Sequence, residues 1–260
     1  MTTATATLVY LYAIVGDDGA TFRDRSGIDG RSVRAIAEGG LVALVSDVPA
    51  ESFDQPALDE NVRDGRWLTP RATAHQAVNA AAHAVLAASL PVPFGTIYRS
   101  DERIREMLRS RADELRAKLT AVRGRSEWVV GLHRDTVQAG EHLAEMRDAI
   151  SHAGVPGGPG RTYLEKRRDE GELRAELRRL DEEASLAARH AVGRVSKSAY
   201  DEPIVEDAGD IVARTTYVLR GEDEHRFADA VDGFNADWKV RGYELRASGP
   251  WPTYRSSGAH

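Results

Sequence analysis

The segment 7–15 (TLVYLYAIV) limits the possible folds more than any other part of the chain. It is dense in Val, Ile, Leu and Tyr, and β-branched and aromatic residues favour strands. Successive side chains of a strand point to opposite faces, and in this segment both faces are apolar. One face carries Leu8, Tyr10, Tyr12 and Ile14, and the other carries Val9, Leu11, Ala13 and Val15. Because such a strand needs apolar cover on both sides, we expect it at the centre of a sheet or at an interface.

The rest of the first half alternates between strand and helix patterns. The predicted elements are a strand at 41–48, a loop with a short helical turn at 50–70, a helix at 72–89, a strand at 90–99 and a helix at 100–122. The first helix is rich in Ala, a strong helix former. The strand at 90–99 (LPVPFGTIYR) contains two prolines, which restrict it to a sheet edge or a bulge. Ser100 is suited to cap the helix that follows.

The second half follows the order β-α-β-β-α-β. Its predicted elements are strands at 127–133, 200–205, 211–219 and 243–247, and helices at 136–153, 161–195 and 222–238. This order is typical of a ferredoxin-like sandwich. We interpret the first half, β-β-α-β-α, as a distorted ferredoxin-like relative. The predicted fold class is therefore α+β with two domains, residues 1–123 and residues 124–260, the second with long helices at about 136–195 and a Pro/Trp tail.

Charge and cysteine content exclude several function classes. The 260 residues carry a net charge of −6, which argues against nucleic acid and anionic membrane as partners. The chain has no Cys, so disulfides, thiolate nucleophiles and Cys-type zinc sites are excluded. Its apolar run 8–15 is shorter than the roughly 20 residues that cross a bilayer, and no signal peptide is recognisable. We expect a cytoplasmic protein.

The sequence predicts no catalytic residue, no cofactor and no metal site. His75 and His83 lie on one predicted helix, but eight residues of helix separate them by about 12 Å, too far to share a metal. The Gly-rich segment 154–160 (GVPGGPG) precedes a helix but lacks the Lys and Ser or Thr of a phosphate loop. We therefore interpret it as a connecting loop.

Two unusual segments remain, 90–96 (LPVPFGT) and 249–254 (GPWPTY). Their prolines restrict the backbone, while Phe94, Trp251 and Tyr254 offer apolar area. A structural corner is the simpler interpretation, and a partner-binding surface is the alternative.

Taken in order, these segments and four others resemble the gas vesicle protein F/L family. The matching stretches are 11–15 (LYAIV), 74–78 (AHQAV), 90–96 (LPVPFGT), 127–130 (EWVV), 160–164 (GRTYL) and 248–254 (SGPWPTY). The resemblance covers nearly the whole chain. It departs from the family pattern at Gln76, where an acidic residue is usual, at Pro93, and at Thr253 and Arg255 in the closing motif.

The resemblance implies a non-enzymatic accessory or minor structural protein that is required for gas vesicle formation. Its expected partners are the small hydrophobic shell protein, bound during nucleation or in a chaperone-like role, and other accessory gas vesicle proteins. A soluble acidic carrier would itself resist aggregation while it covers such a client. The expected location is the cytoplasm, at the gas vesicle. The candidate partner-binding residues are His75, Phe94, Tyr163, Trp251 and Tyr254.

The alternative is a ligand-binding regulator or an enzyme built on ferredoxin-like domains. It requires a pocket where titratable side chains converge, for example around His75, His83 and Arg99. RNA binding ranks last, because the sequence lacks the aromatic stacking motif that RNA-binding sheets of this kind use.

Overall fold

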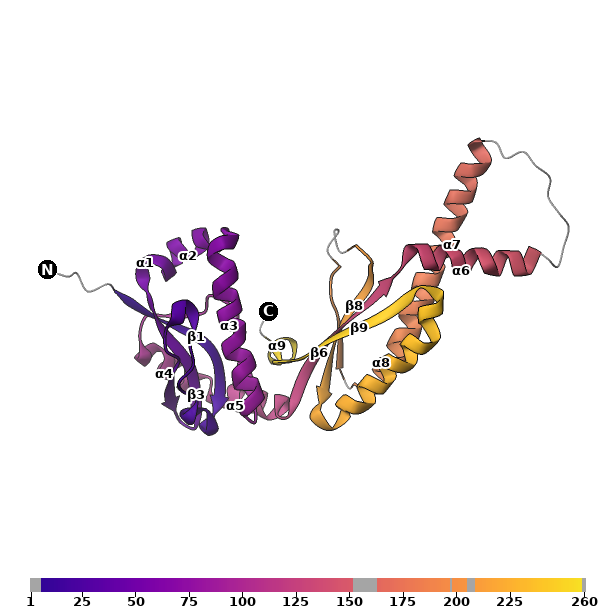
Figure 1. The fold of residues 1–260 in the computed structure, drawn as a ribbon. Helices are drawn as coiled ribbons and strands as arrows, with labels where there is room; N and C mark the ends of the chain where they lie inside the picture. The colour runs from indigo at the N-terminus through magenta and orange to yellow at the C-terminus, as the bar shows by residue number, and fades with distance from the viewer. Residues whose placement is uncertain (1–5, 152–162, 197, 205–208, 259–260) are drawn as a thin grey trace. The chain divides into compact units, whose positions relative to one another are not determined.

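The computed structural model describes residues 6–151, 163–196, 198–204 and 209–258, and among these the side chains of 148–151 and 163–170 are left aside. The chain divides into two compact units (Figure 1). Unit 1 comprises Met1–Glu127 and Pro250–His260, and unit 2 comprises Trp128–Gly249. Each unit combines one sheet with helices, which confirms the predicted α+β fold class.

The sheet of unit 1 has the order β2-β3-β1-β4, and β5 also pairs with β1. Its strands are β1 (Thr7–Gly16), β2 (Arg34–Glu38), β3 (Leu41–Pro49), β4 (Ser89–Pro91) and β5 (Ile97–Tyr98). The short 3-10 helices η1 (Asp17–Thr21) and η2 (Ile28–Gly30) lie between β1 and β2. β1 pairs antiparallel with β3, β4 and β5, so it occupies the central position that its sequence predicts. β2 was not predicted.

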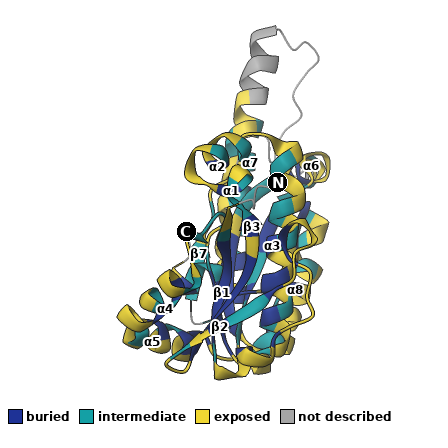
Figure 2. Cartoon of the chain, turned by 90° about the vertical axis from the view of Figure 1, so that its left-hand side faces the viewer, coloured by how far each residue is buried: buried dark blue, intermediate teal, exposed yellow. Residues whose placement is uncertain are grey.

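Both faces of β1 are covered, and Figure 2 shows β1 and β3 largely in the colour of buried residues. One cluster of buried side chains contains Val9, Leu11 and Ile14, and the other contains Tyr10, Tyr12, Ala13 and Val15. This grouping differs from strict alternation beyond Tyr12. The register with β3 shifts between Leu11 and Ala13, and a bulge at this point exchanges the faces of all residues that follow it.

Helices cover the two faces of this sheet. They are α1 (Ala50–Phe53), α2 (Gln55–Asn61), α3 (Gly65–Val85), α4 (Asp101–Ser110), α5 (Ala112–Val122) and α9 (Tyr254–Ser257). Side chains of α1, α2 and α3 pack on the tyrosine face of β1, and those of α4 and α5 pack on the Val9 face.

The prediction of a loop at 50–70 is wrong. Asp54 and Asp64 accept hydrogen bonds from first-turn amides and start α2 and α3 within this segment. The predicted helix at 100–122 is divided at Arg111 into α4 and α5. Ser100 caps α4 as expected, because its hydroxyl accepts from the Arg103 amide.

The Pro-interrupted segment lies at the sheet edge, as predicted. β4 ends at Pro91 and β5 begins at Ile97, and both strands pair with the same central strand β1. Residues 92–96 form a loop between the two short strands. We call this segment the Pro loop.

The sheet of unit 2 has the order β7-β8-β6-β9. Its elements are β6 (Arg125–Arg134), α6 (Thr136–Ser151), α7 (Tyr163–Gly193), β7 (Ser198–Asp201), β8 (Ile211–Arg220), η3 (Gly221–Asp223), α8 (Glu224–Trp238), η4 (Lys239–Arg241) and β9 (Tyr243–Trp251). The order of these elements along the chain confirms the predicted β-α-β-β-α-β pattern. The strand order in the sheet is consistent with a ferredoxin-like arrangement. The Gly-rich segment 154–160 lies outside the described residues.

The two compact units differ from the predicted domain limits mainly at the tail. Residues 250–260, which the sequence placed in the second domain, group with unit 1. The physical reason is a set of hydrogen bonds from this segment to Ser89 and Glu127, both of unit 1. Among the described residues, none of the helices has the length and apolar character needed to cross a membrane.

Candidate functional site

His75 lies at the centre of a hydrogen-bond network in unit 1. It is on α3, only 4% exposed, and it links the central strand to the Pro loop. The Tyr10 hydroxyl lies 2.9 Å from His75 Nδ1, and His75 Nε2 lies 3.2 Å from the Val92 carbonyl oxygen. The Gly95 amide donates to the same Tyr10 oxygen. Tyr10 and His75 therefore hold both ends of the Pro loop.

The charge state of His75 follows from its burial. Burial lowers the pKa of His75 to about 4, and the bond to the Val92 carbonyl opposes this effect only in part. The imidazole is therefore neutral near pH 7, with a single proton. Nε2 faces both the Val92 carbonyl oxygen, which only accepts, and the Asn79 side-chain amide nitrogen, while Nδ1 faces the Tyr10 hydroxyl.

Phe94 packs inward from the Pro loop. Its ring lies 5.8 Å from the His75 ring and 6.0 Å from the Tyr10 ring, both edge-on, and 6.5 Å from Trp67. Such edge-to-face pairs add to the stabilisation that burial provides. The prolines and the aromatic cluster make the Pro loop a structural corner, which was the simpler of the two interpretations.

The tail segment, residues 250–258, packs against the same region. The Thr253 hydroxyl donates to the Ser89 carbonyl oxygen at 3.3 Å, and Thr253 is buried. Tyr254 faces the Asn79 side chain, and burial raises the pKa of Tyr254 to about 12. Asn79 lies one helical turn beyond His75 on α3, so α3 contacts both the Pro loop and the tail segment.

Glu127 anchors the tail segment. This side chain is only 3% exposed, and its carboxylate accepts three hydrogen bonds from two consecutive residues. They come from the Arg255 amide at 3.2 Å, the Ser256 amide at 2.9 Å and the Ser256 hydroxyl at 3.0 Å. Hydrogen bonds to an ionised group are stronger than neutral ones, so Glu127 is the main polar contact of the tail segment.

The structure brings three of the five candidate residues together. His75 lies on α3, Phe94 packs against its ring, and Tyr254 faces Asn79 one turn further along the same helix. The first is buried and the other two are half-buried. Trp251 precedes this group and is 43% exposed. Tyr163 begins α7, and its side chain lies outside the described residues.

Sequence reasoning missed three residues of this region. Tyr10 was assigned only to a strand face and Glu127 only to the start of a strand, and Asn79 was not a candidate residue. One signal for Glu127 was present, since it is an acidic residue that opens an otherwise apolar strand, Glu127-Trp128-Val129-Val130. The contacts of all three are to residues distant in sequence, which no local pattern reports.

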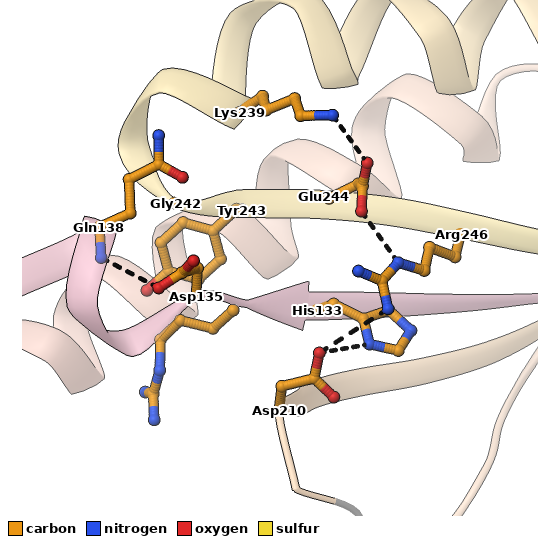
Figure 3. A pocket seen from close by; sticks show the side chains of 10 residues that line it. His133, Asp135, Gln138, Asp210, Lys239, Gly242, Tyr243, Glu244 and Arg246 are labelled. Carbon is orange, nitrogen blue, oxygen red and sulfur yellow. Dashed lines mark hydrogen bonds and ion pairs between the residues drawn. The ribbon is translucent and has the colours of Figure 1, made fainter.

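A polar pocket of about 360 Å³ in unit 2 is a second candidate site (Figure 3). His133 Nδ1 lies 3.0 Å from the Asp210 carboxylate, and this hydrogen bond lowers the pKa of Asp210. Glu244 pairs with Lys239 at 3.1 Å and with Arg246 at 2.9 Å. Because these charged side chains pair with one another, the pocket offers no field of one sign to a charged ligand.

Neither region has the composition of a metal centre. Within the described ranges, no three His, Asp or Glu side chains group closely enough to hold a metal ion. His83 hydrogen-bonds to Ser126 at 2.9 Å, whereas His75 bonds to Tyr10 and Val92. These two histidines therefore have separate partners and do not form the site that the ligand-binding alternative requires.

Fold and sites together define a class of protein: two compact α+β units, with a Pro loop and an anchored tail segment as the most distinctive surface of the first. Comparison with known proteins names this class. The family described as gas vesicle synthesis protein GvpL/GvpF matches residues 8–255. The chain belongs to this family.

Individual relatives agree with the assignment. The chain is 30% identical to gas vesicle protein L of Streptomyces sp. (strain CB03234), over 98% of this chain and 94% of that protein. It is 26% identical to gas vesicle protein L1 of Halobacterium salinarum, over 94% and 88% respectively. Crystal structures of GvpF from Anabaena sp. PCC7120 and Microcystis aeruginosa share its fold, with TM-scores of 0.72 and 0.65 at 17% identity. Each covers 96% of this chain and 98% of the crystallised one.

Proposed function

We propose that this chain is a non-enzymatic accessory or minor structural protein of gas vesicles that binds the small hydrophobic shell protein during assembly. Membership of a family of gas vesicle synthesis proteins supports the assembly role. A nucleating or chaperone-like protein must present apolar surface to such a client and stay folded itself. The two clusters of buried side chains on either side of β1 give unit 1 a hydrophobic core of its own, so its fold does not depend on a client.

One observation carries the choice of binding surface. Trp251 is the one aromatic side chain among the exposed large hydrophobic residues of the described chain. Tryptophan is enriched among the residues that dominate binding energy at protein interfaces. Pro250 and Pro252 flank it and restrict the backbone, and Glu127 anchors the residues that follow. Trp251 is thus a candidate anchor whose position is set before a partner arrives.

The other candidates have different roles in this proposal. His75 and Tyr254 are positioning residues, because both are turned toward the interior and support the backbone near the surface. Phe94 keeps the Pro loop on the core. Tyr163 keeps its status as a candidate from the resemblance alone.

Co-purification with the shell protein, and vesicle formation in cells, test the proposal. Trp251→Ala should reduce recovery of the shell protein about tenfold or more, since truncating a central aromatic anchor commonly costs over 1.4 kcal/mol. Leu186→Ala is the matched control, because Leu186 is 68% exposed but lies on α7 in unit 2. Normal recovery and normal vesicles with Trp251→Ala would refute this surface as the binding site.

Two further statements belong to the same proposal. The other partners are accessory gas vesicle proteins, and the place of action is the cytoplasm, at the growing vesicle. A ligand-binding regulator or enzyme is the competing function, and its best location is the pocket around His133. Because the charges there pair internally, assembly is the better supported function.

A further inference from the structure

The tail segment contacts unit 1 in the way that a bound peptide contacts its receptor. Its polar bonds reach Ser89 on β4 and Glu127 on β6 of unit 1, and its Tyr254 side chain faces Asn79 on α3. Its bonds to itself are short-range, from the Ser257 hydroxyl to the Tyr254 carbonyl and from the Ser257 amide to the Thr253 carbonyl. The segment is therefore a short folded piece seated on a surface made by other residues.

That surface, which we call the tail seat, does not depend on the tail segment for its construction. Asn79 lies within the 21-residue helix α3, Ser89 in a strand paired with β1, and Glu127 in the 10-residue strand β6. Side chains held by regular elements keep their positions better than those on loops. Without the tail segment the Glu127 carboxylate would lose three hydrogen bonds and the Ser89 carbonyl one, so the seat offers acceptors to a peptide.

The fit is also incomplete. Ser89 Oγ is buried without a hydrogen-bond partner among the described residues, and the Tyr254 hydroxyl faces Asn79 without a hydrogen bond of good geometry. Buried polar atoms without partners weaken an association, because water would satisfy them in the undocked state. The polar contacts that hold the seated tail are therefore those to Glu127 and to the Ser89 carbonyl oxygen.

We propose that the tail seat is a peptide-binding site, and that it accepts the tail segment of a second copy of this chain as well as its own. The recognised chemistry is a Pro-Thr-Tyr-Arg-Ser-Ser peptide. It supplies two consecutive amides and a hydroxyl to the Glu127 carboxylate, a threonine hydroxyl to the Ser89 carbonyl, and a phenol to the space beside Asn79.

A second copy fits because its tail is identical, so every contact made within one chain is available between two chains. Exchange of an identical element is a low-cost route to association. Within one chain the tail competes at a high effective concentration, so exchange requires either a high protein concentration or a weakened internal contact.

Two complementary full-length variants test the proposal. Ser256→Pro removes the amide N–H and the hydroxyl that donate hydrogen bonds to the Glu127 carboxylate. This variant therefore has an intact seat and a defective tail. Glu127→Gln keeps the side-chain volume but replaces an acceptor oxygen with a donor, so this variant has a defective seat and an intact tail. Light scattering on each variant alone should show monomers, and an equimolar mixture should show a two-copy complex. A mixture that stays monomeric at the highest soluble concentration would overturn exchange between copies.

A fluorescent peptide of residues 249–258 provides a second measurement that does not need the Glu127 variant to fold. Its anisotropy should rise in a saturable way with the Ser256→Pro variant. The wild-type chain, whose own tail competes, should bind it at least about tenfold more weakly. The same peptide carrying Ser256→Pro is the matched control and should not bind. Absence of saturable binding to the Ser256→Pro variant would refute the peptide site itself. Neither measurement contains the shell protein, so their outcome is independent of the proposed function.

Discussion

The buried histidine of α3 gives a sharp prediction about pH. His75 has a pKa of about 4 in the folded protein because burial disfavours its charged form, whereas an unfolded histidine has a pKa of about 6.5. As the pH falls below 6.5, the unfolded chain therefore takes up a proton that the folded chain rejects. Unit 1 loses stability through the window from pH 6.5 to pH 4, and the stability is fully present above 6.5.

The magnitude follows from the two pKa values. They differ by about 2.5, and each pH unit in the window is worth about 1.4 kcal/mol, so the full loss is about 3 kcal/mol. At pH 5 the loss is about 2 kcal/mol. This is a large share of the roughly 5–15 kcal/mol that stabilises a typical domain.

His75→Gln removes the titrating group and keeps a side chain that can form hydrogen bonds. At pH 7.5 the variant should be less stable than the wild type, by about 1–3 kcal/mol, because Tyr10 and Val92 lose part of their bonding. The difference in stability between wild type and variant should be about 2 kcal/mol smaller at pH 5. The reason is that only the wild type loses stability when His75 of the unfolded chain takes up a proton. Urea unfolding at both pH values, followed through amide exchange in β1, measures the stability of unit 1.

His225→Gln is the matched control, because it removes a histidine whose side chain is 82% exposed on α8 of unit 2. Its gap to the wild type, measured in β1, should stay within about 0.5 kcal/mol at both pH values. If the difference in free energy of unfolding between the wild type and His75→Gln is the same at pH 7.5 and pH 5, the assignment of a neutral, buried His75 is refuted.

Three other predictions follow from single contacts. Tyr10→Phe should destabilise unit 1 by about 1–3 kcal/mol in chemical denaturation, because the Gly95 amide and His75 Nδ1 lose their shared partner. Gly242→Ala should lower the stability of unit 2 by more than about 1 kcal/mol in the same assay, since Gly242 has a φ of +82° and an added Cβ would lie 2.6 Å from the Ala139 amide nitrogen. Equal stability of that variant would contradict the backbone placement. His133→Ala should leave vesicle formation in cells unchanged, and loss of vesicles with a folded variant would favour the pocket of unit 2 as the functional site.

The candidate site was predictable in its parts and not in its assembly. The prolines of 90–96 and 249–254 marked both segments as unusual, and Ala-rich composition predicted the helix that carries His75. No local pattern indicated that both segments contact the same helix, α3. The distance between Thr253 and its partner Ser89, 164 residues in sequence, is the clearest case.

Local physics determined much of this protein from sequence alone. Two apolar faces on one strand required a central position, two prolines required a sheet edge, and the β-α-β-β-α-β order of the second half followed from periodicity. Tertiary structure decided the rest. A bulge between Leu11 and Ala13 exchanges the faces of the residues that follow it in β1. Hydrogen bonds to the buried Glu127 carboxylate hold the tail segment in unit 1. The reason is the same in both cases: register and long-range hydrogen bonds depend on what the partner strand or segment offers, and that partner is distant in the sequence.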